Sequence, residues 1–451
     1  MKRLFIFLLT AFSLSAFSQN TDSLVLRKIF GNAITNYEAY NNLGYLCSNT
    51  PGRLMGSENS IKALKYLKTY LEGLNCDTVY LQEYKADAWK HNSSRAKLVS
   101  TGENYGLSIT ALGPSGSTPE GGITAEVIEV NGIQELKQMK REDVEGKIVF
   151  FNRPVNPTFI NTFPMYGDAV DQRARGPQAA AEMGAVAALV RSVTTLNDDN
   201  PHTGNTHLSG RRLPAAGIGI VSADRLSNSL KKDKNLKVEL NIDTEELNDI
   251  TTYNLIAEIK GTEKPDEVIL LGGHIDSWFN APGAHDDGAG VVQTADVIRI
   301  FKQLNLKNKR TIRFVAFMDE EYSQSGSKVY ASSIDTLKEK IIFALESDAG
   351  GFAPEGFTMR AKKEHFEQIS GFQPLLSPYG ITYIRKGGAG VDIYPLKRFG
   401  IPLVEFRTSS QRYFDLHHSA NDSFDKVNFR ELQLGTTCIT GLVYLVDKNG
   451  L

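Results

Sequence analysis

Residues 272–290, GGHIDSWFNAPGAHDDGAG, place two histidines and three aspartates among glycines and a proline. Imidazole nitrogens and carboxylate oxygens are the groups that bind catalytic zinc, which keeps a coordination position open for water. Glycines let such a segment turn sharply and bring its side chains toward one point. Later stretches add groups of the same kind: Glu320 and Glu321 in DEEYSQSGS, Asp348 in ESDAGG, and His417 with His418 in HHSANDS. These residue types predict a metal site built from nitrogen and oxygen ligands.

Five of these side chains make a balanced set for two metal ions. Two zinc ions lie about 3.5–4 Å apart when a carboxylate and a water molecule bridge them. The candidate ligands are His274, Asp286, Glu321, Asp348 and His418. With Asp286 as the bridge, each ion gains one histidine and one further carboxylate, and the charges nearly cancel. A structural zinc site would instead close four ligands around one ion and would usually employ cysteine.

Glu320 is the carboxylate that this ligand set leaves over. Neighbouring residues at the end of a strand point in different directions, so Glu321 can bind metal while Glu320 faces the substrate. A carboxylate beside an activated water molecule can accept its proton. We therefore expect Glu320 to be the general base.

The elements around these motifs predict a mostly parallel α/β sheet flanked by helices. After Thr252, apolar strands such as EVILLGGHID and KRTIRFVAFMDEEY alternate with helical stretches such as GVVQTADVIRIFKQLNL. Ligands of such sheets bind outside the carboxyl ends of the strands. His274, the Glu320–Glu321 pair and Asp348 each follow an apolar strand, so we expect them at one edge of the sheet.

The rest of the chain predicts a signal segment and an inserted domain. Residues 1–18 carry Lys2 and Arg3 before an apolar run and small residues, which is typical of a secretory signal peptide cleaved near Gln19. The Pro/Gly/Ser-rich stretch PSGSTPEGG marks a boundary. We therefore divide the mature chain into a catalytic domain, residues 19–116 and 249–451, and an inserted β-rich domain, residues 117–248. We expect the product to be secreted or otherwise extracytoplasmic, with no membrane span after signal removal.

Composition narrows the classes of ligand. The chain of 451 residues has a formal net charge of −2, so it lacks the excess of positive charge that is typical of proteins that bind nucleic acid. This net charge is more consistent with small ligands that are neutral or carry both signs of charge. Cys47, Cys76 and Cys438 are too few and too scattered for a disulfide scaffold or a cysteine-based zinc site, and at most one bridge can form.

The motifs GHIDSW, GAHDDGAG, DEEYSQSGS, ESDAGG and HHSANDS occur in an order that resembles the co-catalytic zinc exopeptidases, which include bacterial aminopeptidases and glutamate carboxypeptidase. The likeness is strongest to the carboxypeptidase Q group, and GPQAAAEMGAVAALVRSV resembles its protease-associated domain. The resemblance implies hydrolysis of short peptides or dipeptides with two Zn²⁺ per chain in a homodimer. It places the metal ligands on His274, Asp286, Glu321, Asp348 and His418, and the general base on Glu320. Asp276 matches the carboxylate that orients the ligand imidazole.

Several assignments remain open in the sequence. His417 is the alternative to His418 as ligand, or it faces the oxyanion of the reacting carbonyl. We read His285 as a group at the rim of the site and Asp287 as a loop carboxylate. The loop KGGAGVDIYPL offers Asp392 for a substrate amine, or it is a plain turn. We expect no metal pair from the two histidines in NPHTGNTHL.

The function also has alternatives. Family ligands do not decide whether the enzyme reads the free amino or carboxyl end of a peptide. An aminopeptidase of the same family is therefore the first alternative. From other classes, a single-zinc glutaminyl cyclase and an inactive receptor-like module remain, and the complete ligand set argues against both.

Overall fold

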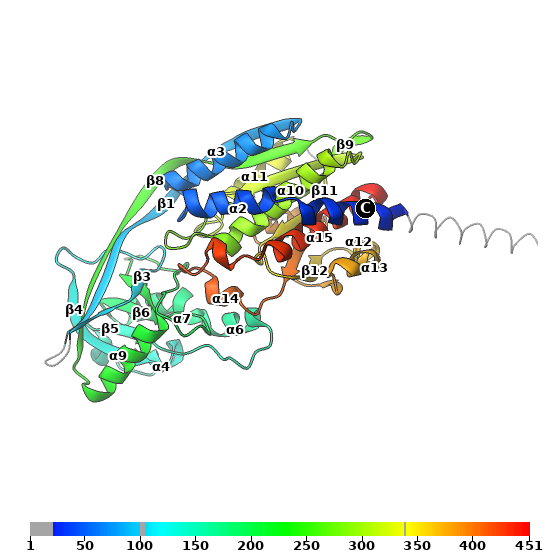
Figure 1. Ribbon diagram of the computed structural model, residues 1–451. Coiled ribbons are helices and arrows are strands. Elements are labelled where there is room, and N and C mark those ends of the chain that lie inside the picture. Colours follow the sequence, from blue (N-terminus) through cyan, green and yellow to red (C-terminus); the bar gives the residue numbers. More distant parts are fainter. Residues whose placement is uncertain (1–20, 100–103, 211, 338–339) are drawn as a thin grey trace, which may run out of the picture.

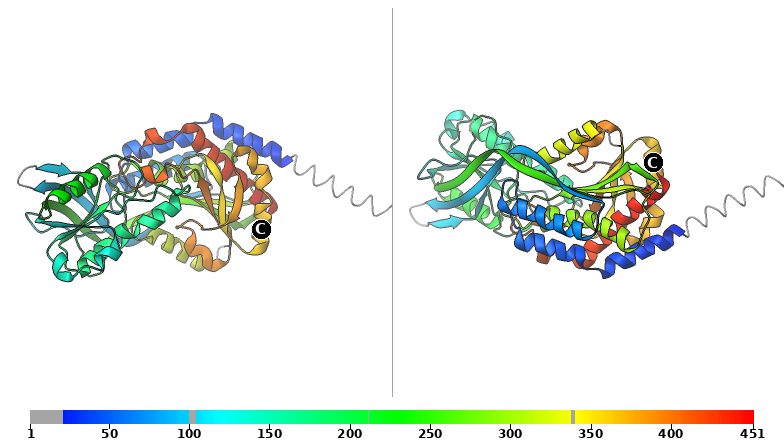
Figure 2. Two further views of the ribbon diagram at one scale, coloured as in Figure 1. Left: turned by 90° about the horizontal axis from the view of Figure 1, so that it is seen from below. Right: turned by 90° about the horizontal axis from the view of Figure 1, so that it is seen from above.

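The computed structural model describes residues 21–99, 104–210, 212–337 and 340–451 (Figure 1). The predicted signal segment, residues 1–18, lies outside the described residues. The described chain forms two lobes joined by a long two-stranded ribbon (Figures 1 and 2). We call them the core lobe, which carries the predicted site motifs, and the second lobe.

The core lobe is a mixed sheet with a parallel centre, as predicted. The strand order is β13-β12-β14-β11-β9-β10-β8. Its central strands are β14 (Leu403–Thr408), β11 (Lys340–Ser347), β9 (Lys264–His274) and β10 (Arg310–Phe317), all paired in parallel. At the edges, β12 (Pro354–Arg360) runs antiparallel to β14, β13 (Tyr383–Lys386) runs parallel to β12, and β8 (Lys237–Ile259) runs antiparallel to β10.

Helices cover both faces of this sheet because its strands are apolar on both sides. All eight residues of β10 are buried, for example. One face packs on α2 (Glu38–Asn49), α3 (Glu58–Gly73), α10 (Ala289–Gln303) and α15 (Phe429–Asn449), and the other on α11 (Ser325–Leu337). On α3, Leu64, Leu67 and Leu71 are buried at three- and four-residue spacing, and Ser57 caps the helix by accepting a hydrogen bond from the backbone N–H of Ser60 at 3.1 Å.

The second lobe continues the same sheet. From β8 the order runs through β4 (Ile123–Val130), β5 (Ile148–Phe151), β6 (Ala187–Arg191), β7 (Ala215–Ile218) and β3 (Ile109–Ala111). Its helices are α4 (Ile133–Leu136), α5 (Arg141–Val144), α6 (Thr162–Ala169), α7 (Asp171–Ala174), α8 (Gly176–Glu182) and α9 (Ile220–Lys232). The lobe therefore carries substantial helix beside the β structure expected of it.

A ribbon of β1 (Thr78–Val99) and β8 connects the lobes. The two strands pair antiparallel from Thr78 opposite Glu258 to Val99 opposite Lys237. β8 passes through residue 248 without interruption, and β3 and the short β2 (Tyr105–Leu107) precede residue 117. The sheet of the second lobe thus uses the far half of β1 and the strands that follow it, and the domain bounds 117–248 stay a prediction.

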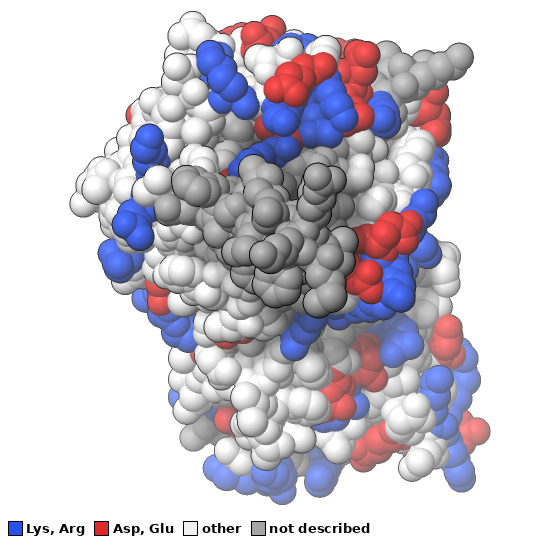
Figure 3. Space-filling model, turned by 90° about the vertical axis from the view of Figure 1, so that its right-hand side faces the viewer, with Lys and Arg blue, Asp and Glu red and all other residues white. Residues whose placement is uncertain are grey.

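Further expectations concern cysteines, charge and hydrophobic spans. Cys47, Cys76 and Cys438 are free thiols. On the face shown in Figure 3, basic and acidic side chains lie side by side. Among the described residues, no helix combines the length and apolarity needed to cross a bilayer.

Candidate metal centre

Three parallel strands deliver the predicted ligands to one edge of the sheet. His274 is the last residue of β9 and lies opposite Phe317, the last residue of β10. Glu320 and Glu321 follow β10, and Asp348 follows β11 directly. Because the carboxyl ends of parallel strands meet at the same edge, these side chains lie together as expected.

Asp286 lies on a short turn, η1 (Ala284–Gly288), at the start of α10. Its Oδ1 is 3.2 Å from His274 Nε2, and its Oδ2 is 3.2 Å from His418 Nε2. The two carboxylate oxygens therefore face two different histidines, which is the geometry of a bridging ligand.

Each histidine also faces a second carboxylate. His274 Nε2 lies 3.6 Å from Asp348 Oδ1, and His418 Nε2 lies 3.1 Å from Glu321 Oε2. The cluster consists of two half-sites that share Asp286. The sequence predicts this arrangement, in which each metal ion gains one histidine and one carboxylate besides Asp286.

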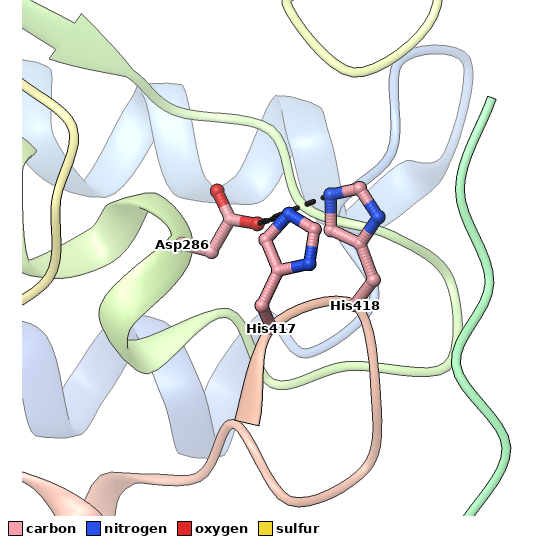
Figure 4. A group of neighbouring side chains, drawn as sticks. All are labelled: Asp286, His417 and His418. Atoms are coloured by element: carbon pink, nitrogen blue, oxygen red, sulfur yellow. Dashed lines mark ion pairs between the residues drawn. The ribbon is translucent and has the colours of Figure 1, made fainter. Parts of the chain in front are cut away.

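His417 lies close to the same centre (Figure 4). Its Nε2 is 3.5 Å from Asp286 Oδ2, and its ring stacks on His418 with centroids 3.4 Å apart. Either histidine can reach Asp286, but among the ion-pair contacts of the described residues only His418 also meets Glu321. This difference favours His418 as the ligand and leaves His417 facing the cavity.

The donor set fits zinc. His274 Nε2, Asp286 Oδ2 and Asp348 Oδ1 are buried and lack a hydrogen-bond partner among the described residues. Burial lowers the pKa of His274, but the adjacent carboxylates of Asp276, Asp286 and Asp348 outweigh it and raise this pKa well above its usual value. Burial and the Asp286 charge raise the pKa of Glu321 to about 7. Carboxylates crowded together around imidazole nitrogens are what a divalent ion stabilises.

Asp276 fixes the turn that carries Glu320 and Glu321. Its carboxylate accepts hydrogen bonds from the backbone N–H groups of Asp319, Glu320 and Glu321, at 2.9, 3.2 and 3.4 Å. Its backbone carbonyl lies 3.2 Å from His274 Nδ1, closer than its own Oδ1 at 3.7 Å. Asp276 therefore orients the imidazole through its carbonyl and the base through its carboxylate.

Asp287 is held by the backbone, as expected for a loop carboxylate. It accepts hydrogen bonds from the N–H groups of His274 and Gly290, at 3.1 Å each. A Cβ at Gly273 or Gly290 would lie 2.3 Å from an oxygen of this carboxylate. The glycines of the opening segment thus permit the close packing of Asp287 behind the centre.

Two further positioning residues gave little signal in the sequence. Asp422 accepts hydrogen bonds from the backbone N–H groups of His285 and Asp286, at 2.7 and 3.0 Å. The fully buried Arg53 donates to the carbonyls of Ile275, Pro282 and Gly283, at 2.5, 2.6 and 2.7 Å. In the sequence, Asp422 lies within the motif HHSANDS, and Arg53 lies in the ordinary stretch PGRL.

The second lobe supports His418. The His418 backbone has φ +62°, a conformation that non-glycine residues seldom adopt. Its carbonyl accepts a hydrogen bond from the Thr203 N–H at 2.9 Å, and its Nδ1 lies 3.4 Å from the Thr203 carbonyl and 3.3 Å from Arg173 Nη1. A carbonyl at Nδ1 leaves Nε2 available for a metal ion.

His285 corrects the sequence interpretation. It is 1% exposed and stacks on Phe352 with ring centroids 4.0 Å apart, and its Nδ1 accepts a hydrogen bond from the Gly351 N–H. Burial lowers its pKa to about 3. The residue is a packed core histidine beneath the site and not a group at its rim, although it is not a ligand either.

The other sequence candidates belong to no metal-binding group among the described residues. Asp392 is 1% exposed, and neither of its carboxylate oxygens has a hydrogen-bond partner among the described residues. His202 is buried and His207 is exposed. Among the described residues, neither histidine belongs to a metal-binding group.

A cavity of about 490 Å³ opens in front of the half-sites. The second lobe contributes Phe163, Tyr166, Arg173, Asn205 and His207 to its wall. Glu320 also lines it, and burial together with the nearby Asp348 and Glu321 charges raises the pKa of Glu320 well above its usual value. A carboxyl group with a raised pKa beside a metal centre is suited to accept and return a proton.

Comparisons with known proteins show that the chain is similar to peptidases. The sequence profile of peptidase family M28 matches residues 254–441. Carboxypeptidase Q of Xenopus laevis is 32% identical over 412 residues, which cover 91% of this chain and 85% of that protein. The crystal structure of a peptidase M28 precursor from Shewanella amazonensis is similar with a TM-score of 0.90 at 30% identity, over 96% of this chain and 98% of that one. A zinc aminopeptidase from Bacillus subtilis shares the fold, with a TM-score of 0.65 at 21% identity over 90% of this chain and 94% of its own.

Proposed function

Because the chain belongs to peptidase family M28, we propose that it is a di-zinc exopeptidase that hydrolyses short peptides or dipeptides. The observation that carries the proposal is the position of Asp286. Its two oxygens lie 3.2 Å from His274 and 3.2 Å from His418, and Glu320 lines the same cavity. Two half-sites with a shared carboxylate and a spare base are the parts that hydrolysis by an activated water molecule requires.

His274, Asp286 and Asp348 would hold one zinc ion, and His418, Asp286 and Glu321 the other. When bound, the ions would lower the pKa of a water molecule and polarise the scissile carbonyl. Glu320 accepts the proton of the attacking water at its carboxylate and returns it to the leaving amine. His417 donates toward the carbonyl oxygen as negative charge develops there.

The second lobe restricts access to this chemistry. Phe163 and Tyr166 from α6 line the cavity, and the Thr162 Oγ1 donates to the Ser410 carbonyl at 2.5 Å. The Asn205 side chain donates to the Tyr322 carbonyl at 2.7 Å. A site walled by two lobes favours short substrates over folded proteins. Secretion after signal cleavage and assembly as a homodimer remain part of the proposal.

The test is turnover of an unblocked dipeptide and its N-acetylated form by the zinc-loaded mature protein. We expect the dipeptide to be cut and Glu320→Gln to lower kcat by about 10²–10⁴-fold with both zinc ions retained. The exposed Glu364→Gln is the matched control and should leave kcat unchanged. Full activity of Glu320→Gln would show that Glu320 is not the general base.

The acetylated substrate separates the alternatives. If acetylation abolishes hydrolysis, the enzyme reads the free amine as an aminopeptidase or dipeptidase does. If the acetylated form is also cut, the carboxyl end is read. A measured zinc content of about one ion per chain would support the alternative function of a glutaminyl cyclase. A zinc-loaded protein that cuts no peptide would support the alternative of a binding module.

A further inference from the structure

A second cavity of about 550 Å³ adjoins the catalytic cavity. The two cavities share Phe163, Gly388 and Arg407 as wall residues. The second one lies along the edge strands β12 and β13, and Asn161 and Phe163 of the second lobe border it. A peptide that enters the catalytic cavity therefore has a neighbouring space to occupy.

Basic side chains predominate in the wall of this second cavity. It contains Arg385, Lys386 and Arg407 against one acidic side chain, Glu355. Arg385 and Lys386 are exposed and form no ion pair with any described residue. Their cationic groups lie against aromatic rings instead, Arg385 at 4.2 Å from the Tyr383 ring centroid and Lys386 at 5.3 Å from that of Phe366. Both side chains thus border the cavity and carry charges without an ionic partner among the described residues.

Arg407 is partly engaged. Its Nε donates to Thr358 Oγ1 at 3.2 Å and its Nη2 donates to Glu405 Oε2 at 2.5 Å. Its guanidinium lies 5.3 Å from the ring centroid of Phe163. Nη1 has no hydrogen bond or ion pair to a described residue, so one end of the guanidinium remains for a ligand.

Two glycines keep the approach to these groups open. A Cβ at Gly387 would lie 2.9 Å from Thr358 Cβ, and a Cβ at Gly388 would lie 3.6 Å from Arg407 Nη2. A larger residue at position 388 would place its side chain against the guanidinium. The glycine pair of the loop KGGAGVDIYPL therefore allows the cavity wall to pass close to Thr358 and Arg407.

We propose that Arg385, Lys386 and Arg407 form a subsite, here called the cationic subsite, that binds a carboxylate of the peptide substrate. The proposal rests on the proposed peptidase function and adds the substrate chemistry that the metal ligands do not specify. Guanidinium and ammonium groups recognise carboxylates by charge-assisted hydrogen bonds, which strengthen where water is partly excluded. The carboxylate comes either from the C-terminus of the peptide or from an acidic side chain.

The test measures binding, so that it does not depend on turnover. Zinc-loaded Glu320→Gln is titrated calorimetrically with a neutral dipeptide and with its C-terminal amide. A second pair of amidated dipeptides carries Glu or Gln at the second position. We expect removal of the recognised carboxylate to weaken binding about 10-fold or more, since hydrogen bonds to charged groups are worth about 1.5–3 kcal/mol.

The ratio of the two Kd values within a peptide pair measures the discrimination. The double substitution Arg385→Gln/Lys386→Gln, added to Glu320→Gln, should reduce this ratio to near one. The matched control is Lys362→Gln/Lys363→Gln on the exposed start of the neighbouring helix α12 (Lys363–Ser370), which removes the same charge outside the cavity. The control should retain the ratio. The first peptide pair reports the C-terminal carboxylate and the second reports the acidic side chain.

The outcomes separate this inference from the proposed function. The cationic subsite is refuted if neither pair discriminates, or if the Arg385/Lys386 double variant discriminates as well as its control. If discrimination depends on Arg385 and Lys386 while the wild type cuts no peptide, the subsite stands and the peptidase function fails. If the wild type cuts peptides with no effect of any carboxylate, the peptidase function stands and the subsite fails.

Discussion

The Asp422 carboxylate holds the backbone of Asp286, the residue shared by both half-sites, through a hydrogen bond of 3.0 Å from the Asp286 N–H to Asp422 Oδ2. The other oxygen accepts the N–H of His285 at 2.7 Å. Burial and the Asp286 charge raise the pKa of Asp422 to about 7. A carboxylate that carries no metal itself thus determines where the bridging carboxylate lies.

Asp422→Asn should therefore weaken zinc binding. An amide offers one acceptor and turns its NH₂ group toward a backbone N–H, so one of the two hydrogen bonds is lost. Loss of a group that positions a ligand typically lowers metal affinity about 10–100-fold. Competition with a chelator measures the change. The exposed Asp425→Asn is the control, and equal zinc affinities for the two variants would contradict the role of Asp422.

Asp286→Ala should remove zinc from both half-sites, because both histidines face this one carboxylate at 3.2 Å. The zinc content after dialysis should fall from about two per chain to below one. Asp348→Ala removes a contact to His274 only and should spare the half-site of His418 and Glu321. Metal analysis with circular dichroism separates lost metal from lost fold. Equal zinc contents in the two variants would show that Asp286 is not shared.

Arg53→Ala should destabilise the core lobe. The substitution removes the Arg53 donor from the carbonyls of Ile275, Pro282 and Gly283, of which Gly283 keeps a hydrogen bond from the Gly288 N–H at 3.1 Å. Hydrogen bonds to charged groups and unsatisfied buried acceptors each cost about 1–3 kcal/mol, so we expect a loss of about 3 kcal/mol. Urea unfolding measures it. Arg53→Lys should recover only part of the lost free energy of unfolding, because one ammonium group cannot reach three carbonyls. Full recovery would show that the positive charge, and not the three hydrogen bonds, stabilises the core lobe.

The Glu258–Arg313 pair should make stability depend on acidity. Arg313 Nε donates to Glu258 Oε1 at 2.6 Å, and Lys260 lies 2.7 Å from Oε2. Burial raises the pKa of Glu258, but Arg313 and Lys260 outweigh it and lower this pKa below 4.5. The folded state therefore binds fewer protons than the unfolded state in this range, and stability is lost as the pH falls through the lowered pKa.

Urea midpoints between about pH 6 and pH 3 measure this contribution. Glu258→Gln should be less stable at pH 6 and should lose less stability on acidification than the wild type. The control Glu263→Gln removes a more exposed carboxylate, 3.8 Å from Lys309, and should keep the wild-type slope. Parallel wild-type and Glu258→Gln curves would contradict the lowered pKa.

The sequence predicted the parts of the site that depend on strand ends. His274, Glu321 and Asp348 were placed together because each follows an apolar strand, and parallel strands end at one edge. His285 was misread because its neighbour Asp286 faces the metal centre, whereas the turn of η1 directs His285 into the core against Phe352. Alternation along the chain does not reveal which side of such a turn is buried.

Long-range contacts were beyond the reach of sequence patterns. Arg53 contacts carbonyls of residues 275–283, and Thr203 of the second lobe supports His418. Nothing in the local sequence around either residue marks such a partner. The pairing of β1 with β8 is long-range in the same sense, since it joins segments far apart in the chain.

That pairing also sets an order of events during synthesis. Apart from the short β2, the partner of β1 is β8, which is complete only when Ile259 has left the ribosome. Until then, the buried leucines of α3 lack most of the sheet on which they pack. Native contacts between distant segments form slowly and leave apolar surface exposed in the meantime. The apolar face of α3 therefore gains its complete packing surface only after the second lobe has been made, and truncation before Ile259 leaves both lobes without their complete common strand.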